Sequence, residues 1–353
     1  MIDKQIIDCL LCGGDAELRQ KELRGYQEPE TFNIYHCPGC NTAFSLPRVN
    51  TAKVYNDIYK NGDLVPGYER YWKYAKIVKS LADPLEYLSN TEETYWGVKE
   101  ALLQYVKDKK SSKILEIGCG LGYFTYSLRK ANYNVIGLDI SQTAVAHAKE
   151  TFGDHYICAD LFEYAQLNSG LFDLVILTEV IEHISKPLDF IKSILKLLKS
   201  QGKAIITSPN KSLYPSDIIW ATDLPPVHCW WFSEESMKYI ARSLDITVSF
   251  VNYNNYYKKN YKVIALKSWR DSHLPNPFFN KNGELINQVA STKNTLKPYI
   301  QVLLTRIPFV SVIFSKIKQY VMTGIGKSRR LFDKDLIVCN DRGNIFCAIM
   351  HKR

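Results

Sequence analysis

The sequence predicts an α/β fold, in which strands and helices alternate around a parallel sheet. One observation is a short apolar run at residues 113–117 that leads into three closely spaced glycines and then a helix. A second is that further short apolar runs follow, with helix-like segments between the early ones. Chains that alternate in this way form parallel sheets covered by helices. A length of 353 residues leaves room for further domains beside such a sheet.

We expect seven strands in this sheet, because each apolar run has the length and composition of a buried strand. The first helix of the sheet domain is expected at residues 124–130, directly after the glycines. The expected strands lie at residues 113–117, 134–138, 155–158, 172–177, 203–207, 246–251 and 344–350. Residues 111–251 are then the core of the domain, and residues 343–353 supply its last strand.

The first 48 residues contain two Cys-x2-Cys pairs, which predict a separate zinc-binding module. Cys9 and Cys12 form one pair, and Cys37 and Cys40 form the other. Two such pairs can close a tetrahedral Zn²⁺ site, and four thiolates leave no open position, so we expect a structural zinc. Disulfides are the alternative, which a reducing compartment disfavours. A segment this short has little core, so the metal would supply its folding energy.

Residues 49–110 are expected to form helices, because apolar residues recur there at spacings of three and four. The segment is rich in Tyr and Trp. We expect this segment to link the zinc-binding module to the sheet and to form a lid over the sheet domain.

Charge is unevenly distributed along the chain. Residues 258–353 contain 18 Lys and Arg but 5 Asp and Glu, whereas the whole chain has a net charge of +9. The asymmetry favours an anionic partner or a solvated basic face. The N-terminus has no basic segment followed by an apolar run, and no apolar stretch is long enough to cross a bilayer. We therefore expect a cytoplasmic protein whose nine cysteines are reduced.

The glycine turn and its neighbouring acids predict a cationic ligand that contains a nucleoside. Glycines let the backbone approach a ligand, and Asp139 ends the next strand, where an acid can accept hydrogen bonds from ribose hydroxyls. A nicotinamide dinucleotide needs a third glycine at the position of Tyr123. Glu116 precedes the turn and would repel a pyrophosphate but attract a cation. The pattern therefore favours S-adenosylmethionine.

The motif Glu-x-Gly-Cys-Gly-x-Gly, the Gly-Leu-Asp strand end and the segment FDLVILTEVIEHI resemble the class I S-adenosylmethionine-dependent methyltransferases. This resemblance implies a Rossmann-like seven-stranded methyltransferase sheet with an antiparallel last strand. It also implies that Asp139 holds the ribose of the donor. The other implied donor contacts are Glu116, Gly118, Gly120 and Gly122 on the methionine side, and Ile140, Asp160 and Leu161 around the adenine.

The end of the fourth strand predicts the reaction chemistry, because ligands bind beyond the carboxyl ends of parallel strands. Glu179, Glu182 and His183 would share one face of a helix there, and His228 follows the fifth strand in a loop. Either histidine can act as the general base toward an acceptor hydroxyl. The same four residues can instead bind Mg²⁺, which a similarity to ubiquinone-pathway O-methyltransferases and small-RNA 2′-O-methyltransferases implies. A third alternative is a capping and packing role for Glu182 and His183.

The expected acceptor is a hydroxyl of a saccharide-like or small natural-product molecule, from a surface-glycan or secondary-metabolite pathway. Residues 223–228 are similar to bacterial methyltransferases of such gene clusters. A four-cysteine module followed by this domain is similar to deoxysugar C-methyltransferases of antibiotic pathways. Sugar C-methylation, metal-dependent RNA 2′-O-methylation and a non-catalytic binding role remain as alternatives. The chain has no recognisable RNA-binding motif, which disfavours a nucleic-acid partner.

Residues 252–342 are expected to form a basic, partly amphipathic helical insertion before the last strand. Apolar blocks alternate with Arg and Lys over residues 296–330. A basic amphipathic helix can contact a membrane surface, where the acceptor would be linked to a lipid. Packing against the domain, or the face of a homo-oligomer, is the alternative.

Overall fold

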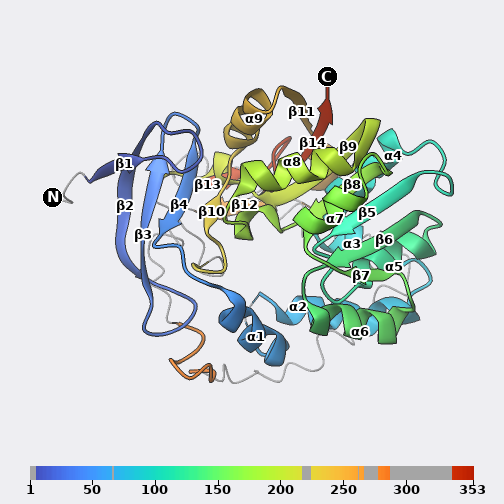
Figure 1. The fold of residues 1–353 in the computed structure, drawn as a ribbon, viewed down its shortest axis with the longest axis horizontal. Helices are drawn as coiled ribbons and strands as arrows, with labels where there is room; N and C mark the ends of the chain where they lie inside the picture. The colour runs from blue at the N-terminus through green and yellow to red at the C-terminus, as the bar shows by residue number, and fades with distance from the viewer. Residues whose placement is uncertain (1–4, 66, 217–223, 261, 266–276, 287–335) are drawn as a thin grey trace.

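The computed structural model describes residues 5–65, 67–216, 224–260, 262–265, 277–286 and 336–353. Two larger sheets organise these residues (Figure 1). One sheet has seven strands and forms the centre of the molecule. The other has five strands and contains the N-terminal module.

The seven-stranded sheet has the strand order β11-β14-β9-β8-β5-β6-β7. Neighbouring strands from β9 to β7 are parallel, whereas β14 is antiparallel to both β9 and β11. This confirms the expected α/β class and the antiparallel last strand. The strands are β5 (Lys113–Ile117), β6 (Asn134–Asp139), β7 (Tyr156–Cys158), β8 (Phe172–Thr178), β9 (Leu198–Pro209), β11 (Ile246–Phe250) and β14 (Ile345–Lys352).

Alternating side chains of the central strands face two different helical layers. Ile114 and Ile176 belong to one apolar core with residues of α3 (Pro84–Thr91), α4 (Glu93–Tyr105) and α5. Leu115 and Leu177 belong to a second core with residues of α7, α8 and α9. Because successive strand residues point to opposite faces, both faces must be apolar, as the continuous apolar runs predict. The helices of the core are α5 (Tyr123–Lys130), α6 (Gln142–Phe152), α7 (Leu161–Leu167), α8 (Pro187–Leu197) and α9 (Glu234–Ser243).

The five-stranded sheet is antiparallel and has the order β1-β2-β3-β4-β10. The N-terminal strands are β1 (Ile6–Asp8), β2 (Asp15–Arg24), β3 (Thr31–Cys37) and β4 (Thr42–Leu46). The fifth, β10 (Trp230–Trp231), comes from the loop after β9, about 180 residues later in the chain. In that pairing Trp230 lies opposite Phe44. A strand shared in this way ties the N-terminal module to the core domain.

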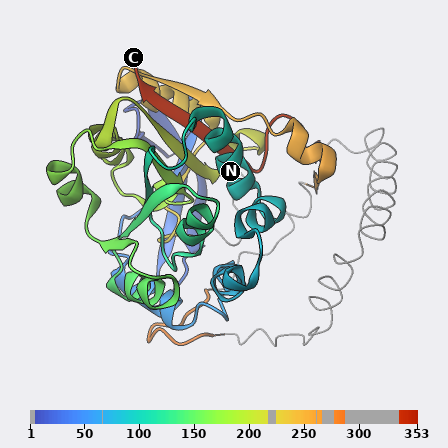
Figure 2. The same cartoon turned by 90° about the vertical axis from the view of Figure 1, so that its right-hand side faces the viewer.

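The segment between the two sheets is helical. It contains α1 (Ala52–Lys60), α2 (Glu69–Ile77), the 3₁₀ turn η1 (Val78–Ser80), α3 (Pro84–Thr91) and α4 (Glu93–Tyr105). The first two helices run below the gap between the sheets in Figure 1. Further along, α4 packs across β9 and the antiparallel strand β14 (Figure 2).

The described parts of the basic insertion differ from the helical segment that the sequence suggests. One short helix, α10 (Asn254–Lys259), is followed by β12 (Val263–Ala265), which pairs antiparallel with β13 (Leu336–Val338). Phe279 bridges to Gln27 of the N-terminal module. Residues 296–330, where membrane contact is expected, lie outside the described residues. Within the described part of the chain, no helix has the length and apolarity needed to cross a membrane.

Candidate active site

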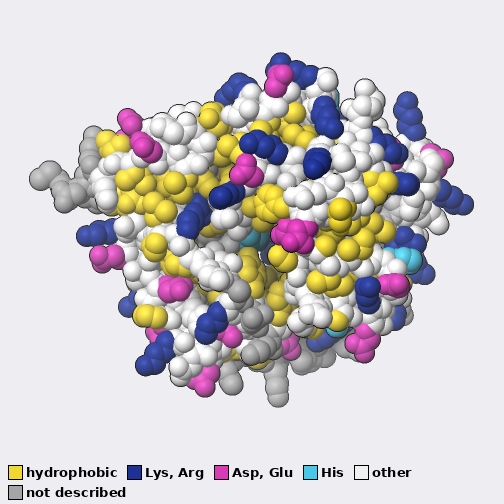
Figure 3. All heavy atoms as spheres, in the orientation of Figure 1, with side chains coloured by type: hydrophobic (Ala, Val, Ile, Leu, Met, Phe, Trp, Pro, Cys, Tyr) yellow, Lys and Arg dark blue, Asp and Glu magenta, His cyan; other side chains and the backbone are white. Residues whose placement is uncertain are grey.

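A cavity of about 960 Å³ lies at the carboxyl ends of β5, β6 and β8. Such a volume is at the upper end of the range of roughly 300–1,000 Å³ that is common for ligand sites. The segment that leads from β4 into α1 and α2 lines its other side. Figure 3 shows this face hollowed near its centre, where histidine side chains are visible. The cavity therefore lies where ligands bind in parallel sheets.

The turn after β5 exposes backbone to the cavity. Gly118, Gly120 and Gly122 all have positive φ angles, of 73°, 49° and 80°. A Cβ atom at Gly118 would lie 2.4 Å from Cγ2 of Val180, so no other residue fits there without movement of the chain. The three glycines line the cavity together, as the motif predicts.

Glu116 lies beneath this turn and is 2% exposed. Its Oε2 accepts a short hydrogen bond from the Thr125 hydroxyl. Burial raises the pKa of Glu116 to about 8, and the nearby Asp139 also raises it. A cation in the cavity would favour the ionised carboxylate, so the site is suited to a positively charged ligand.

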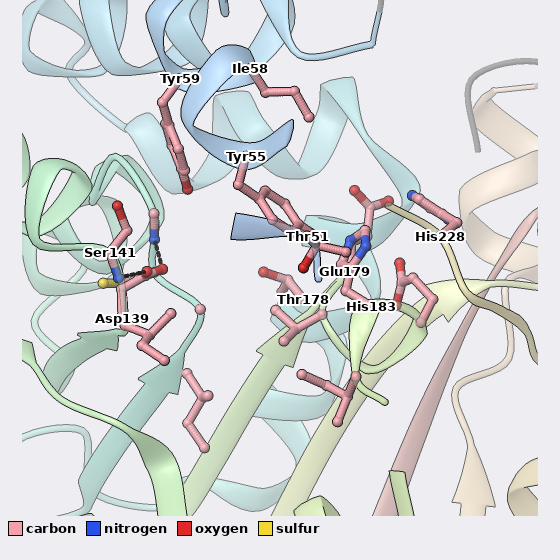
Figure 4. Close-up of a pocket in the computed structure, with 18 of the residues that line it drawn as sticks. Thr51, Tyr55, Ile58, Tyr59, Asp139, Ser141, Thr178, Glu179, His183 and His228 are labelled. Atoms are coloured by element: carbon pink, nitrogen blue, oxygen red, sulfur yellow. Dashed lines mark hydrogen bonds between the residues drawn. The ribbon is translucent and has the colours of Figure 1, made fainter. Parts of the chain in front are cut away.

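Asp139 ends β6 on the wall opposite the histidines (Figure 4). Its two oxygens accept hydrogen bonds of 2.8 Å from the backbone N–H groups of Gly120 and Ser141. Burial raises the pKa of Asp139, while these backbone hydrogen bonds lower it. The contacts fix the carboxylate against the glycine turn, and each oxygen keeps a second lone pair for a ligand.

The three residues expected around the adenine also line the cavity. Ile140 is 73% exposed, which is unusual for an apolar side chain at a strand end. Asp160 is the N-cap of α7, and its Oδ1 accepts hydrogen bonds from the N–H groups of Phe162 and Glu163. Leu161 follows it and is buried. Asp160 thus has a structural role in addition to the expected contact with a ligand.

The expectation that Glu179, Glu182 and His183 share one face of a helix is wrong. Glu179 has a φ of 53°, a left-handed conformation, and only residues 181–183 form a single 3₁₀ turn, η2. No α-helix therefore runs through the two glutamates. As a result Glu179 and Glu182 bind different partners, and Glu179 is not in the group of possible metal ligands that contains the other three residues.

Glu179 is held by residues from the linking helices. The Arg70 guanidinium lies 3.1 Å from its Oε2, and the hydroxyls of Tyr71 and Thr94 donate hydrogen bonds of 2.7 and 3.0 Å. Burial would raise the pKa of Glu179, but Arg70 and these hydroxyls hold it below its ordinary value. Glu179 is therefore an ionised residue that joins α2 and α4 to the cavity wall. A non-glycine residue with positive φ at such a position is typical of functional sites.

Glu182, His183 and His228 converge on one point of the cavity. One ligand atom from each lies within 4.8 Å of the others. The two imidazole rings meet edge to face with centroids 4.5 Å apart. Ser208 donates a 3.0 Å hydrogen bond to Oε2 of Glu182, which is 1% exposed. Burial lowers the pKa of His228 to about 4, so this ring is neutral at pH 7.

The tautomer of His183 follows from its backbone contact. Its Nδ1 lies 2.7 Å from the carbonyl oxygen of Val227, and a carbonyl oxygen can only accept a hydrogen bond. Nδ1 therefore carries the proton when the ring is neutral, and Nε2 carries the lone pair of the ring. This is the arrangement that a general base or a metal ligand requires.

Several cavity residues escaped the sequence analysis. Tyr55 of α1 lies edge to face with His183, at a centroid distance of 6.2 Å. Tyr59 lies on the same side of the cavity as Asp139 (Figure 4). Arg48, in the segment between β4 and α1, also lines the cavity. The abundance of Tyr in residues 49–110 was a signal for a cavity wall, but it could not indicate which rings point inward.

The four cysteines of the N-terminal module lie together. Cys9 Sγ is 3.7 Å from Cys40 Sγ, and Cys12 Sγ is 3.5 Å from Cys37 Sγ. A disulfide bond is about 2.05 Å long, so these thiols are not paired covalently. Tetrahedral zinc with Zn–S bonds of about 2.3 Å requires sulfur atoms about 3.8 Å apart. The hydrogen bond from Cys40 lowers the pKa of Cys9 to about 5, so one thiolate forms readily.

Comparison with known proteins finds relatives for the segment that contains the strands at the cavity. Residues 87–248 match the family model of a methyltransferase domain. This segment is therefore similar to a methyltransferase domain. It covers β5 to β9 and therefore the glycine turn, Asp139 and the histidine at the end of β8.

Curated relatives that match part of this chain include two ubiquinone biosynthesis O-methyltransferases. The protein of Vibrio parahaemolyticus serotype O3:K6 is 32% identical over 120 residues, which are 31% of this chain and 51% of that protein. The protein of Aliivibrio fischeri (strain ATCC 700601 / ES114) is 32% identical over 106 residues, which are 29% of this chain and 45% of that protein. The chain thus spans about half the length of the curated relatives it matches.

Solved structures similar to this chain include a SAM-dependent methyltransferase from Archaeoglobus fulgidus. It is 16% identical, with a TM-score of 0.40, and the match covers 72% of this chain and 93% of that chain. The YcgJ protein from Bacillus subtilis is 14% identical, with a TM-score of 0.41, over 73% of this chain and 99% of that chain.

Proposed function

We propose that this protein transfers a methyl group from S-adenosylmethionine to a hydroxyl of a small, saccharide-like or natural-product acceptor in the cytoplasm. The observation that carries the proposal is the pairing, in one cavity, of a donor wall and a basic imidazole. The donor wall contains the glycine turn, Glu116 and Asp139. The imidazole is Nε2 of His183, on the opposite side. The ubiquinone biosynthesis relatives are named as O-methyltransferases, which supports a hydroxyl acceptor.

Each side of the cavity has a distinct task in this proposal. S-adenosylmethionine supplies an electrophilic methyl group on a sulfonium ion. Asp139 accepts hydrogen bonds from the ribose, and Glu116 balances the positive charge, which together fix the position of the donor. His183 accepts the proton of the attacking hydroxyl at Nε2 and is kept in orientation by Val227. Alignment of the two reacting atoms supplies most of the rate enhancement.

A divalent cation at the acceptor side is the second candidate mechanism. Glu182, His183 and His228 offer one carboxylate oxygen and two imidazole nitrogens close together, and such a set can bind a divalent cation such as Mn²⁺ or Mg²⁺ when water or the acceptor supplies further oxygen ligands. Bound there, a cation would acidify the acceptor hydroxyl. Glu179 is not available to it, because Arg70, Tyr71 and Thr94 already bind that carboxylate.

The proposed activity is tested by incubating the protein with methyl-labelled S-adenosylmethionine and fractionated extract of the source cells. We expect label in a low-molecular-weight, hydroxyl-bearing product. Label in RNA would support RNA methylation, and a new carbon–carbon bond in the product would support sugar C-methylation. No binding of the donor in calorimetry would favour a non-catalytic protein and contradict the proposal.

Chelation in the same assay distinguishes the two mechanisms. With His183 as a metal-free base, we expect EDTA to leave the initial rate unchanged over minutes, before zinc is lost from a closed four-thiolate site. A prompt loss of activity that Mg²⁺ or Mn²⁺ restores, and that Zn²⁺ does not, would instead establish the cation mechanism.

We also propose that Cys9, Cys12, Cys37 and Cys40 bind one structural zinc ion. Replacing Cys37 by serine is expected to abolish zinc binding, measured by elemental analysis against about one zinc per chain for the unchanged protein. We expect the melting midpoint to fall by roughly 5 °C or more, because each lost kcal/mol lowers it by about 2–4 °C in a chain of this size.

Cys158→Ser is the matched control for this test, because Cys158 is exposed and lies outside the four-cysteine group. It should retain the metal. A Cys37→Ser protein with a full complement of zinc would show that these thiols do not bind it.

A further inference from the structure

Two arginines line the cavity, and their surroundings differ. Arg70 is neutralised by carboxylates, since its guanidinium lies 3.1 Å from Glu179 and 3.7 Å from Glu92. Arg48 has no such partner among the described residues. Its Nη1 donates a 3.0 Å hydrogen bond to the carbonyl oxygen of Cys229, and its guanidinium lies over the Trp230 ring at 4.5 Å.

The remaining edge of the Arg48 guanidinium is unused. Nε and Nη2 are both buried, and neither has a hydrogen-bond partner in the described part of the chain. These two nitrogens lie on the same side of the planar group, and together they form the edge that binds a carboxylate or phosphate with two parallel hydrogen bonds. Arginine stays protonated in proteins, so Arg48 is a buried charge that has no acidic partner within the described parts of the chain.

Arg48 belongs to the acceptor side of the cavity. The carbonyl that it binds is that of Cys229, which follows His228 directly. The same loop provides the Val227 carbonyl that orients His183. The backbone N–H of Cys229 in turn donates to the carbonyl of Glu182. Arg48 is therefore connected to both histidines through one loop, whereas Glu116 and Asp139 lie at the strands β5 and β6.

We infer that the acceptor bears an oxyanion, either a carboxylate or a phosphate, which the Nε and Nη2 edge of Arg48 binds. The inference rests on the proposed methyl transfer and specifies its acceptor class. An anion would supply the counter-charge that the described residues lack, in surroundings shielded from water where charged hydrogen bonds are strong. Both nitrogens are buried, so binding of the anion would require a side chain of the cavity wall to move and expose this edge. Arg48 is then a specificity residue that touches the acceptor.

The test compares three sugars that differ in charge. The protein, with zinc present and S-adenosylhomocysteine bound, is titrated at constant ionic strength with glucose 1-phosphate, glucuronate and glucose. We expect at least one anionic sugar to bind roughly 10- to 100-fold more tightly than glucose, the effect of charge-assisted hydrogen bonds. The anionic sugar with the higher affinity shows whether the acceptor carries a phosphate or a carboxylate.

Substitutions at Arg48 assign the effect to this side chain. Arg48→Gln should remove the preference for the anion, and Arg48→Lys should retain part of it, because lysine keeps the charge but not the two-nitrogen edge. Arg19→Gln is the control. Arg19 pairs with Glu17 on the N-terminal sheet, does not line the cavity and carries the same charge. Melting curves establish that each variant is folded.

Two results would overturn the inference. One is that neither anionic sugar binds the unchanged protein more tightly than glucose. The other is that the preference persists in folded Arg48→Gln. Binding of S-adenosylhomocysteine, measured in the same samples, separates either result from a failure of the proposed function. If that compound binds and the anion preference is absent, only the oxyanion inference is wrong.

Discussion

Replacing Asp139 by alanine is expected to weaken binding of S-adenosylmethionine by roughly 100-fold or more, because each lost hydrogen bond to a charged group costs about 1.5–3 kcal/mol. Two effects contribute to this loss. The variant lacks the proposed acceptor for the ribose hydroxyls. It also frees the N–H groups of Gly120 and Ser141, which hold the glycine turn against the end of β6. Isothermal titration with S-adenosylmethionine and S-adenosylhomocysteine measures the affinity directly.

Asp154→Ala is the matched control for this experiment, because Asp154 lies on the same domain with a side chain that is 86% exposed. It should bind the donor as the unchanged protein does. Asp139→Asn keeps one acceptor oxygen for a backbone N–H and should give an intermediate affinity. Near-normal affinity in folded Asp139→Ala would rule out the ribose contact.

His183→Asn is expected to lower kcat by roughly 10²- to 10⁴-fold, the usual contribution of a general base. The amide nitrogen of asparagine can occupy the position of Nδ1 and donate to the Val227 carbonyl, so the local backbone is preserved. The variant then lacks only the Nε2 lone pair. Affinity for S-adenosylhomocysteine should stay unchanged, because His183 lies across the cavity from Asp139 (Figure 4). Initial rates with labelled donor and the identified acceptor measure the effect.

His155→Asn serves as the control, since His155 lies before β7 and does not line the cavity. His228→Asn adds a second comparison. A loss confined to His228→Asn would transfer the role of base to that residue. Equal losses in both variants, together with dependence on Mg²⁺, would favour the cation mechanism. Unchanged kcat in His183→Asn would exclude His183 as the base.

The sheet, and the position of the glycine turn and Asp139 at its edge, could be predicted because local sequence determines them. Each strand of the sheet is a short run that must be apolar on both faces, so its position is visible without knowledge of its neighbours. The glycine turn and Asp139 belong to consecutive strands, and their spacing places them at one edge of the sheet. Even so, β9 begins at Leu198, five residues before the expected strand, because α8 passes into it without a loop.

The acceptor side could not be predicted in the same way, because contacts between distant segments determine it. A helix after β8 is a reasonable expectation from the spacing of its acids and histidine. Arg70, Tyr71 and Thr94 instead bind Glu179 from 85 to 109 residues away and accompany its left-handed backbone. Arg48 and Tyr55 enter the cavity because the N-terminal segment crosses it. No local pattern in the sequence predicts that this segment packs against the cavity.

The pairing of β10 with β4 has a consequence for how the protein could be divided. Trp230 and Trp231 are buried against the N-terminal sheet, and His228 lies two residues before them. Excising the first 48 residues would remove β4, which pairs with β10, and with it the Phe44 ring that packs on Trp230. The N-terminal module thus contributes Ser45, Pro47 and Arg48 to the wall of the cavity and is joined to the core domain through β10.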